Sequence, residues 1–356
     1  TYCVHVMVRH ELEKQLIGGT LSVSDLPREW NRLYKEYLGV DWLAVQNRIV
    51  SSLKSDIGLL NSTNDSILSH SGKQLRPLLS IVMARACAPG IPVADATVRY
   101  AAASELLHNA TLLHDDVADQ SEQRRGNPTV YSLMGPSVSV LVGDYWLVKA
   151  MELILGTAES DVKVIRIFSK TLSDLAEGEM LQLQKAQSGD TDEQDYLRII
   201  YNKTASLFEA ACVSAAVSVD AVHAKVDAAR NYAVALGLAF QIKDDILDYA
   251  GTEKVGKPLG VDILEQKITM PLLGALGNVS PEEASRIRGL IGDIVGNPGH
   301  RDEILAFVKE NGGVEYAQKR LDEYVAQAVE ALNVLPDSYE KECLVELAHY
   351  TSLRNK

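Results

Sequence analysis

Helix signals dominate along the chain, and in several stretches the hydrophobic positions cover more than one face of a helix. The clearest runs are residues 100–113, 138–155 and 228–247. A helix that is apolar on several faces belongs in the centre of a bundle and not on its surface. Strand patterns are scarce. The patterning therefore predicts an all-α protein, a large helical bundle with long helices in its core.

Capping and turn signals divide these runs into separate helices. Ser280, Pro281 and Glu283 combine an N-cap, a proline at the first helical position and a capping box. Residues 296–299 and 311–313 are rich in Gly and Asn and mark turns. We therefore expect a helix to start at Pro281 and helix–helix connections at the two turns.

One acidic pattern, D-D-x-x-D, occurs twice, starting at Asp115 and at Asp244, each time within an apolar helical run. Because residues at i and i+4 stack on one helix face, Asp115 aligns with Asp119 and Asp244 with Asp248. Carboxylates packed beside leucine and isoleucine repel one another unless a cation neutralises them. Hard oxygen ligands suit Mg²⁺, which often shares its shell with substrate phosphates. Two such faces opposed across a cavity would hold a diphosphate.

Basic residues accompany both acidic motifs. Lys73 and Arg76 stand at a predicted helix start, where free backbone N–H groups and the helix dipole favour an anion. Arg124 and Arg125 are adjacent in a predicted turn, and arginine forks of this kind can bind two different phosphate groups. Near the second motif lie Lys203, Lys257 and Lys267, and two helical turns before Asp115 lies His108.

Composition and charge exclude several classes of function. The chain has 356 residues, of which 46% are hydrophobic and 23% charged, and its net charge is −13. This acidic balance argues against a nucleic-acid partner, which would need clustered Lys and Arg. The four cysteines form no C-x-x-C pair, which argues against a zinc site or a disulfide framework. No segment approaches the length of a membrane span and no signal peptide is evident, so we expect no stable membrane insertion and a cytoplasmic location.

Together, the order and spacing of these motifs resemble the trans-isoprenyl diphosphate synthase family, most closely its long-chain polyprenyl (octaprenyl-type) branch. The resemblance covers residues 41–354. Besides the residues above, the matching positions include Glu177, Glu179, Gln182, Thr204, Phe240, Gln241 and the segment 256–271. The resemblance implies an all-α isoprenoid synthase bundle around a central cavity, Mg²⁺ as cofactor and a homodimer.

The resemblance also implies a role for each matching residue. Mg²⁺ would be bound by Asp115, Asp119 and Asp244, with Asp116, Asp245 and Asp248 completing the acidic faces. The allylic diphosphate would be held by Arg124, Lys203, Lys257 and Lys267, and isopentenyl diphosphate by Lys73, Arg76, His108 and Arg125. The implied catalytic residues are Lys203, Thr204 and Gln241, while Glu177, Glu179 and Gln182 are expected to form hydrogen bonds between helices.

In this family, the side chains one and two helical turns before the first acidic motif set the length of the product. Here those positions are Ser104, Leu107, Ala110 and Thr111. None is aromatic, so no ring would stop the growing chain early. The resemblance therefore implies condensation of isopentenyl diphosphate with farnesyl or geranylgeranyl diphosphate into a long, octaprenyl-like all-trans product for quinone side chains.

Three alternatives stay open. A shorter-chain synthase, making farnesyl or geranylgeranyl diphosphate, would use the same acidic and basic motifs. A class I terpene cyclase also ionises a diphosphate on an aspartate-rich helix, but such cyclases usually lack a second D-D-x-x-D motif. A non-catalytic regulatory subunit is the third alternative, and the intact acidic motifs argue against it.

Residues 1–40 depart from this resemblance. They resemble a fragment of a thermostable-type metallocarboxypeptidase but contain no H-E-x-x-H zinc motif, so peptidase activity is not implied. We expect either a fused foreign fragment or an ordinary N-terminal helical extension, followed by a synthase domain over residues 41–356.

Overall fold

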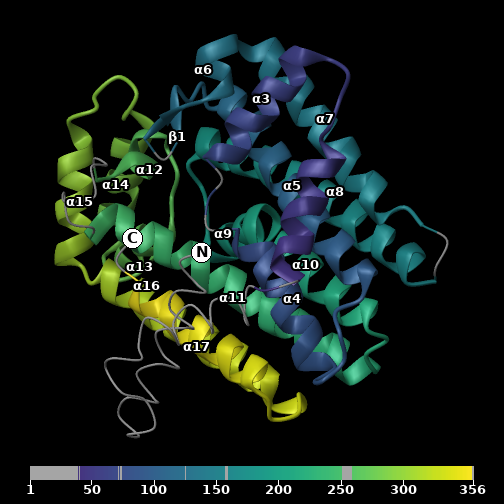
Figure 1. Ribbon diagram of the computed structural model, residues 1–356. Coiled ribbons are helices and arrows are strands. Elements are labelled where there is room, and N and C mark those ends of the chain that lie inside the picture. Colours follow the sequence, from purple (N-terminus) through teal and green to yellow (C-terminus); the bar gives the residue numbers. More distant parts are fainter. Residues whose placement is uncertain are drawn as a thin grey trace, which may run out of the picture. The chain divides into compact units, whose positions relative to one another are not determined.

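Helices make up nearly all of the secondary structure. The computed structural model describes residues 39, 41–70, 72, 74–124, 126–156, 159–250 and 259–354. Within these ranges the only strands form one short hairpin, which confirms the all-α class (Figure 1). The expected boundary at residue 40, and residues 1–38 before it, lie outside the described residues. The chain divides into two compact units, each assembled from separate stretches of sequence.

The first unit comprises the described residues up to Ile167, together with Ala210–Val226 and Leu335–Leu344. It contains a helix over residues 41–52, α3 (Gly58–Ser69), α4 (Leu75–Cys87), α5 (Asp95–Ala118), β1 (Gln123–Arg124), β2 (Asn127–Pro128), α6 (Val130–Met134) and α7 (Pro136–Ile154). It also includes the first part of α8 (Glu159–Ser188) and most of α10 (Ser206–Ser218).

Helix α5 packs against α4 and α7 in the core of the first unit. Its side chains Tyr100, Leu106 and Leu107 are fully buried. Helix α7 approaches α5 closely at Gly143, where a β-carbon would lie 2.5 Å from Nε2 of His114 and 3.3 Å from the carbonyl oxygen of Ala110. The predicted helical run 100–113 is thus confirmed as the middle of a longer helix.

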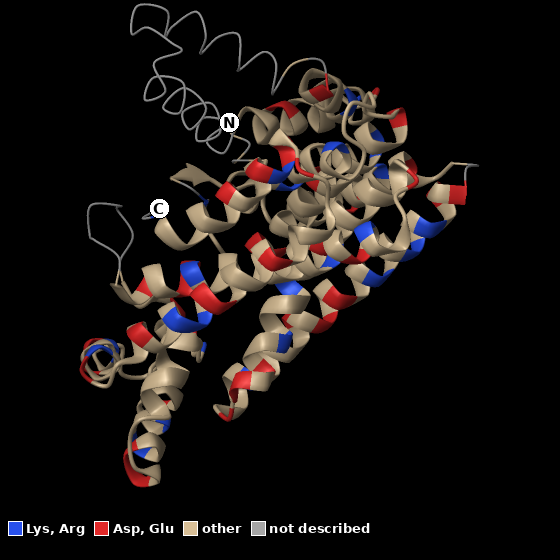
Figure 2. Cartoon of the chain, turned by 90° about the horizontal axis from the view of Figure 1, so that it is seen from below, with Lys and Arg blue, Asp and Glu red and all other residues tan. Residues whose placement is uncertain are grey.

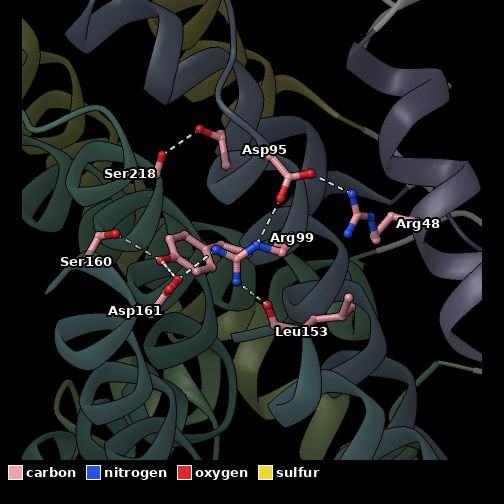
Figure 3. Close-up of polar contacts among 9 residues, drawn as sticks. Arg48, Asp95, Arg99, Leu153, Ser160, Asp161 and Ser218 are labelled. Atoms are coloured by element: carbon pink, nitrogen blue, oxygen red, sulfur yellow. Dashed lines mark hydrogen bonds and ion pairs between the residues drawn. The ribbon is translucent and has the colours of Figure 1, made fainter. Parts of the chain in front are cut away.

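A buried carboxylate ties α5 to the neighbouring helices (Figure 3). The side chain of Asp161 on α8 is 4% exposed and accepts hydrogen bonds from Nη2 of Arg99 at 2.8 Å and from the hydroxyl of Tyr100 at 2.5 Å. Nη1 of Arg99 also donates to the carbonyl oxygen of Leu153, at the end of α7, at 2.8 Å. Because hydrogen bonds to a buried charge are strong, this cluster fixes the ends of α7 and α8 against α5.

The second unit comprises Phe168–Glu209, Asp227–Val334 and the described residues from Val345 onward. It contains the rest of α8, α9 (Glu193–Ile200), the π-helical turn η2 (Tyr201–Ala205), most of α11 (His223–Ala250), α12 (Val261–Leu264), α13 (Met270–Leu276), α14 (Pro281–Gly292), α15 (His300–Glu310), α16 (Gly313–Ala331), the 3-10 turn η4 (Leu332–Val334) and the end of α17 (Tyr339–Leu353).

Helix α13 packs on α15 and α16 in the second unit. The expected helix start is confirmed: Pro281 is at the first position of α14, and the Ser280 side chain accepts a hydrogen bond of 3.3 Å from the backbone nitrogen of Glu283. The expected turn before α16 is also confirmed, with Gly312 at a φ of 69°. Buried Ile287 and Ile304 join α14 and α15 to the same hydrophobic core.

Charged residues of both signs alternate along the described helices (Figure 2). No helix in the described part of the chain has the length and apolar character needed to cross a membrane. On a surface of mixed charge, an anionic ligand must be bound by local groups rather than by a broad positive field.

Candidate active site

The first acidic motif occupies the last turn of α5, in the first unit. The backbone nitrogen of Asp119 donates to the carbonyl oxygen of Asp115 at 2.8 Å, so helical geometry extends through the motif and confirms the i, i+4 relationship. Asp115 is half-buried and Asp119 is exposed. The middle one of the three aspartates, Asp116, is instead buried. Its side chain is 6% exposed and accepts a hydrogen bond from Nε of Arg124 at 2.8 Å.

Arg124 is placed for this contact by the hairpin that follows α5. Strand β1 pairs with β2 in antiparallel register, with Arg124 opposite Asn127. Gly126 adopts a φ of 78°, which suits glycine far better than other residues. The predicted turn is therefore a tight hairpin that directs Arg124 back toward α5. Burial raises the pKa of the Asp116 carboxyl, while the Arg124 charge opposes that shift.

In the second unit, the second acidic motif lies inside α11. Its middle residue, Asp245, is buried and accepts hydrogen bonds from the hydroxyl of Tyr196 at 2.6 Å and from Nε2 of Gln241 at 2.9 Å. Burial raises the pKa of Asp245 well above its ordinary value, and the charge of Asp262 adds to the shift. Asp248 accepts hydrogen bonds of 3.1 Å from the backbone nitrogens of Val261 and Asp262, and so holds the start of α12.

Asp244 differs from its neighbour because it stays partly open to solvent. Its side chain is 44% exposed, and one carboxylate oxygen accepts a hydrogen bond from Nη2 of Arg354 at 2.7 Å. The Arg354 side chain is only 4% exposed. Its guanidinium lies 4.0 Å from the ring centre of Phe240 and also donates to the backbone oxygen of that residue. The C-terminal helix α17 thereby reaches the second acidic motif, a contact that the sequence did not predict.

Both motifs thus share one arrangement: the middle carboxylate is buried and hydrogen-bonded, and the outer ones keep accessible surface. No three His, Cys, Asp or Glu side chains in the described ranges form a group that could hold a metal ion. Mg²⁺ usually takes one or two carboxylates and completes its shell with water and phosphate. The accessible outer aspartates, Asp115, Asp119 and Asp244, fit such a partial ligand set.

The predicted catalytic pair Lys203–Thr204 lies in the π-helical turn η2. Two glycines allow neighbouring helices to approach this turn: a β-carbon on Gly178 would lie 2.7 Å from Cβ of Asn202, and one on Gly237 would lie 2.6 Å from Cα of Ala205. Short π-helical segments occur frequently at functional sites. Here the turn is enclosed by α8 and α11.

Helix α8 holds the amino group of Lys203. Nζ of Lys203 pairs with Oε1 of Glu179 at 2.6 Å and donates to Oε1 of Gln182 at 3.0 Å. Glu177 pairs with Arg198 on α9 at 3.7 Å. The predicted hydrogen bonding between helices is confirmed for Glu179 and Gln182, whereas Glu177 makes a longer ion pair. Thr204 donates to Oε1 of Gln241 at 2.9 Å, which connects the turn to α11.

A cavity of ≈ 160 Å³ opens beside this turn. Five predicted site residues line it: Lys203, Thr204, Gln241, Asp245 and Lys267. Its wall also includes Gln182, Lys185, Tyr196, Asp262, Gln266 and Thr269. Lys267 forms an ion pair with Glu265, and burial raises the pKa of Asp262 to about 6. The cavity therefore combines amino groups, neutral hydrogen-bonding groups and buried carboxyls within the second unit.

The remaining predicted residues of the first unit lie on α4 and α5. Arg76 is in the first turn of α4, and His108 is on α5. Ser104, Leu107 and Ala110 are buried along α5, whereas Thr111 is partly exposed. The hydroxyl of Thr111 donates to the carbonyl oxygen of His108 at 2.8 Å. Lys73, Arg125 and Lys257 lie outside the described residues, so their predicted roles stay predictions.

The chain is similar in sequence and in structure to known proteins. The chain is 38% identical over 323 residues to the octaprenyl diphosphate synthase of Escherichia coli (strain K12), a match that covers 90% of this chain and 98% of that protein. It is 36% identical over 308 residues to the all-trans-nonaprenyl-diphosphate synthase (geranyl-diphosphate specific) of Rhodobacter capsulatus, covering 86% and 93%. The crystal structure of a decaprenyl diphosphate synthase from Rhodobacter capsulatus gives a TM-score of 0.81 at 34% identity, covering 90% and 98%.

Two family models match the chain. Residues 1–48 match the carboxypeptidase Taq (M32) metallopeptidases, which confirms the resemblance expected for the first 40 residues. Residues 58–308, more than half of the 356, match the family described as polyprenyl synthetase. The isoprenoid synthase fold expected from the resemblance is confirmed by the structural likeness. The chain is therefore a prenyltransferase and belongs to the polyprenyl synthetase family.

Proposed function

We propose that this prenyltransferase uses Mg²⁺ to condense isopentenyl diphosphate with farnesyl or geranylgeranyl diphosphate into a long-chain all-trans polyprenyl diphosphate. The observation that carries the proposal is the arrangement shared by both acidic motifs, with a buried, hydrogen-bonded middle aspartate between accessible outer ones. The octaprenyl and nonaprenyl names of the relatives support a long product, and quinone side chains are its proposed use.

The outer aspartates Asp115, Asp119 and Asp244 would hold the metal ions. Bound Mg²⁺ supplies positive charge that stabilises the diphosphate as it leaves. Arg124, Lys203, Lys257 and Lys267 would bind the allylic diphosphate, and Lys73, Arg76, His108 and Arg125 would bind isopentenyl diphosphate. In this proposal the carboxylates bind the Mg²⁺ ions, and the basic side chains bind the diphosphates directly.

The chemistry follows from these positions. The bond between the allylic carbon and the diphosphate oxygen breaks, and the double bond of isopentenyl diphosphate attacks the resulting cation. A new carbon–carbon bond forms, a proton leaves the isopentenyl unit, and the departing diphosphate can accept it. Oxygens fixed beside the cation, such as those of Thr204 and Gln241, lower the barrier because their dipoles are oriented before the charge develops.

We also propose a homodimer. Leu141 and Val148 on α7, and Leu155 directly after its last residue, recur every seven residues and are 67%, 54% and 63% exposed. Side chains with this spacing lie on nearly the same helix face, and an exposed apolar stripe of this kind is typical of an interface. The surface of a second copy of this chain would cover it.

Product analysis tests the proposed function. Purified protein is incubated with Mg²⁺, farnesyl diphosphate and labelled isopentenyl diphosphate, and the products are sized by chromatography. Labelled chains longer than geranylgeranyl would support the proposal, with turnover lost when EDTA is added. Products that stop at geranylgeranyl would indicate a shorter-chain synthase. Cyclic hydrocarbons would indicate a cyclase, and complete inactivity would indicate a regulatory subunit.

A further inference from the structure

A line of hydrogen bonds connects α9 to the π-helical turn through α11. The hydroxyl of Tyr196 donates to Oδ2 of Asp245 at 2.6 Å, and Nε2 of Gln241 donates to Oδ1 of the same carboxylate at 2.9 Å. The hydroxyl of Thr204 donates to Oε1 of Gln241 at 2.9 Å. Tyr196 is 3% exposed and Asp245 is also 3% exposed, so the line begins in the interior of the second unit.

The direction of these hydrogen bonds is fixed by chemistry. The side-chain nitrogen of Gln241 donates to one oxygen of Asp245, while the other oxygen of Asp245 accepts from Tyr196. The amide oxygen of Gln241 then faces Thr204, and Thr204 must donate its proton to that oxygen. Because the proton is used in this way, the hydroxyl of Thr204 offers its oxygen lone pairs to the adjoining cavity. Tyr196, which is separated from Thr204 by Asp245 and Gln241, holds the Asp245 carboxylate in the orientation in which Oδ1 faces Gln241.

The backbone around Thr204 is held independently of these side chains. Gly178 and Gly237 admit α8 and α11 so closely that a β-carbon on either would overlap the π-helical turn. Lys203, next to Thr204, is fixed by Glu179 and Gln182. With the backbone fixed, the hydroxyl of Thr204 can still rotate. The hydrogen bonds that run from Tyr196 to Thr204 restrict this rotation.

We propose that Tyr196 is a positioning residue for the condensation: through Asp245 and Gln241 it fixes the hydroxyl of Thr204 so that oxygen lone pairs face the allylic cation. This inference rests on the proposed function and adds to it a residue that acts on the cation through Asp245, Gln241 and Thr204. A hydroxyl free to rotate would present its proton part of the time, and that end of the dipole repels a cation. Orientation set in advance contributes to the barrier because no reorganisation is needed during the reaction.

The test is Tyr196→Phe, which removes one hydroxyl and keeps the ring. We expect kcat to fall about tenfold, equal to about 1.4 kcal/mol of activation free energy. The KM values for both diphosphates, and the affinity for an unreactive allylic diphosphate analogue measured by calorimetry, should stay within about twofold, because Tyr196 affects the transition state and not ground-state binding.

Tyr100→Phe is the matched control. It also removes a tyrosine hydroxyl from a buried aspartate, Asp161, but in the first unit and on α5, fifteen residues or about 22 Å along the helix from Asp115. Both variants should lower the melting temperature, since each leaves a buried carboxylate short of one hydrogen bond. Only Tyr196→Phe should lower kcat.

A double-mutant cycle with Thr204→Val tests whether Tyr196 acts through Thr204. Without the hydroxyl there is nothing to orient, so Tyr196→Phe should change kcat by less than about twofold in the Thr204→Val background. If Tyr196→Phe does not fold, Gln241→Leu cuts the same line, and its loss of kcat should be smaller in the Thr204→Val background by the share that passes through Thr204.

The possible outcomes distinguish a failure of the positioning role of Tyr196 from a failure of the proposed condensation activity. A wild-type protein that condenses the two diphosphates, together with a Tyr196→Phe variant of normal kcat, overturns the positioning role alone. A tenfold loss that persists in the Thr204→Val background also overturns it, because the effect would then not pass through Thr204. A wild-type protein that forms no polyprenyl product overturns both.

Discussion

Arg354 donates a hydrogen bond of 2.7 Å to Oδ1 of Asp244 and so fastens the last residues of the described chain to the second acidic motif. The guanidinium is nearly buried, and the carboxylate is only partly so. One oxygen of Asp244 is therefore oriented by a fixed charge, and we expect the other to belong to the proposed metal site.

Replacement of this arginine should weaken both stability and metal use. Arg354→Met removes a charge-assisted hydrogen bond, so the free energy of unfolding should fall by about 2 kcal/mol. Asp244 loses its orientation, and the Mg²⁺ concentration for half-maximal turnover should rise about threefold to tenfold. A Mg²⁺ titration of activity and a urea denaturation curve measure the two effects.

Arg320→Met provides the control for that change. Arg320 also pairs with a carboxylate, Glu193 at 3.1 Å, and lies over an aromatic ring, that of Tyr324 at 5.5 Å. It should lower stability without altering the Mg²⁺ requirement. If the two variants behave alike in the Mg²⁺ titration, Arg354 serves only to anchor α17.

Turnover should depend on the accessible aspartates. Asp115→Ala and Asp244→Ala each remove a proposed metal ligand, and kcat should fall by roughly a thousandfold or more, because the lost charge stabilisation exists mainly in the transition state. Asp95→Ala is the control on the same helix, since Asp95 pairs with Arg48 and Arg99 at the start of α5. Near-normal turnover in Asp115→Ala would contradict the metal assignment.

Product length should respond to the α5 positions before Asp115. Thr111→Phe places a ring at a partly exposed position and should shorten the product while the first condensation continues. Ala110→Phe should do the same but also cost about 1–3 kcal/mol of stability, because Ala110 is buried at a close approach of α7. Thr111→Val keeps the volume and should leave the product distribution unchanged. An unaltered distribution in Thr111→Phe would remove this residue from the tunnel.

The stripe on α7 should control assembly. Leu141→Glu places a charge in the proposed interface, where it loses its water, and the particle mass from light scattering should halve. Val295→Glu alters an exposed apolar residue of similar accessibility, 74% against 67%, and should leave the mass unchanged. A dimer that survives Leu141→Glu would place the interface elsewhere.

Much of this site was predictable from the local sequence pattern. The remaining features depend on which face of each helix is buried and on contacts between distant residues. The i, i+4 pairing of Asp115 with Asp119 follows from helix geometry alone. The burial of Asp116 does not, because α5 is apolar on several faces and its periodicity does not distinguish the faces. Long-range contacts could not be predicted from the local pattern either. Tyr196 contacts Asp245, 49 residues away in sequence, and Arg354 contacts Asp244, 110 residues away.

The π-helical turn has a consequence for how this sequence tolerates insertions and deletions. Such a turn contains one residue more than an α-helix would use over the same length. Deleting one residue from Tyr201–Ala205 would let α9 and α10 merge into a regular helix of the same length, because the turn absorbs the extra residue. Lys203 and Thr204, which lie inside the turn, would then lose the positions from which they contact Gln182 and Gln241. In this stretch the number of residues matters as much as their identity, so related chains should differ here by substitution and keep the same length.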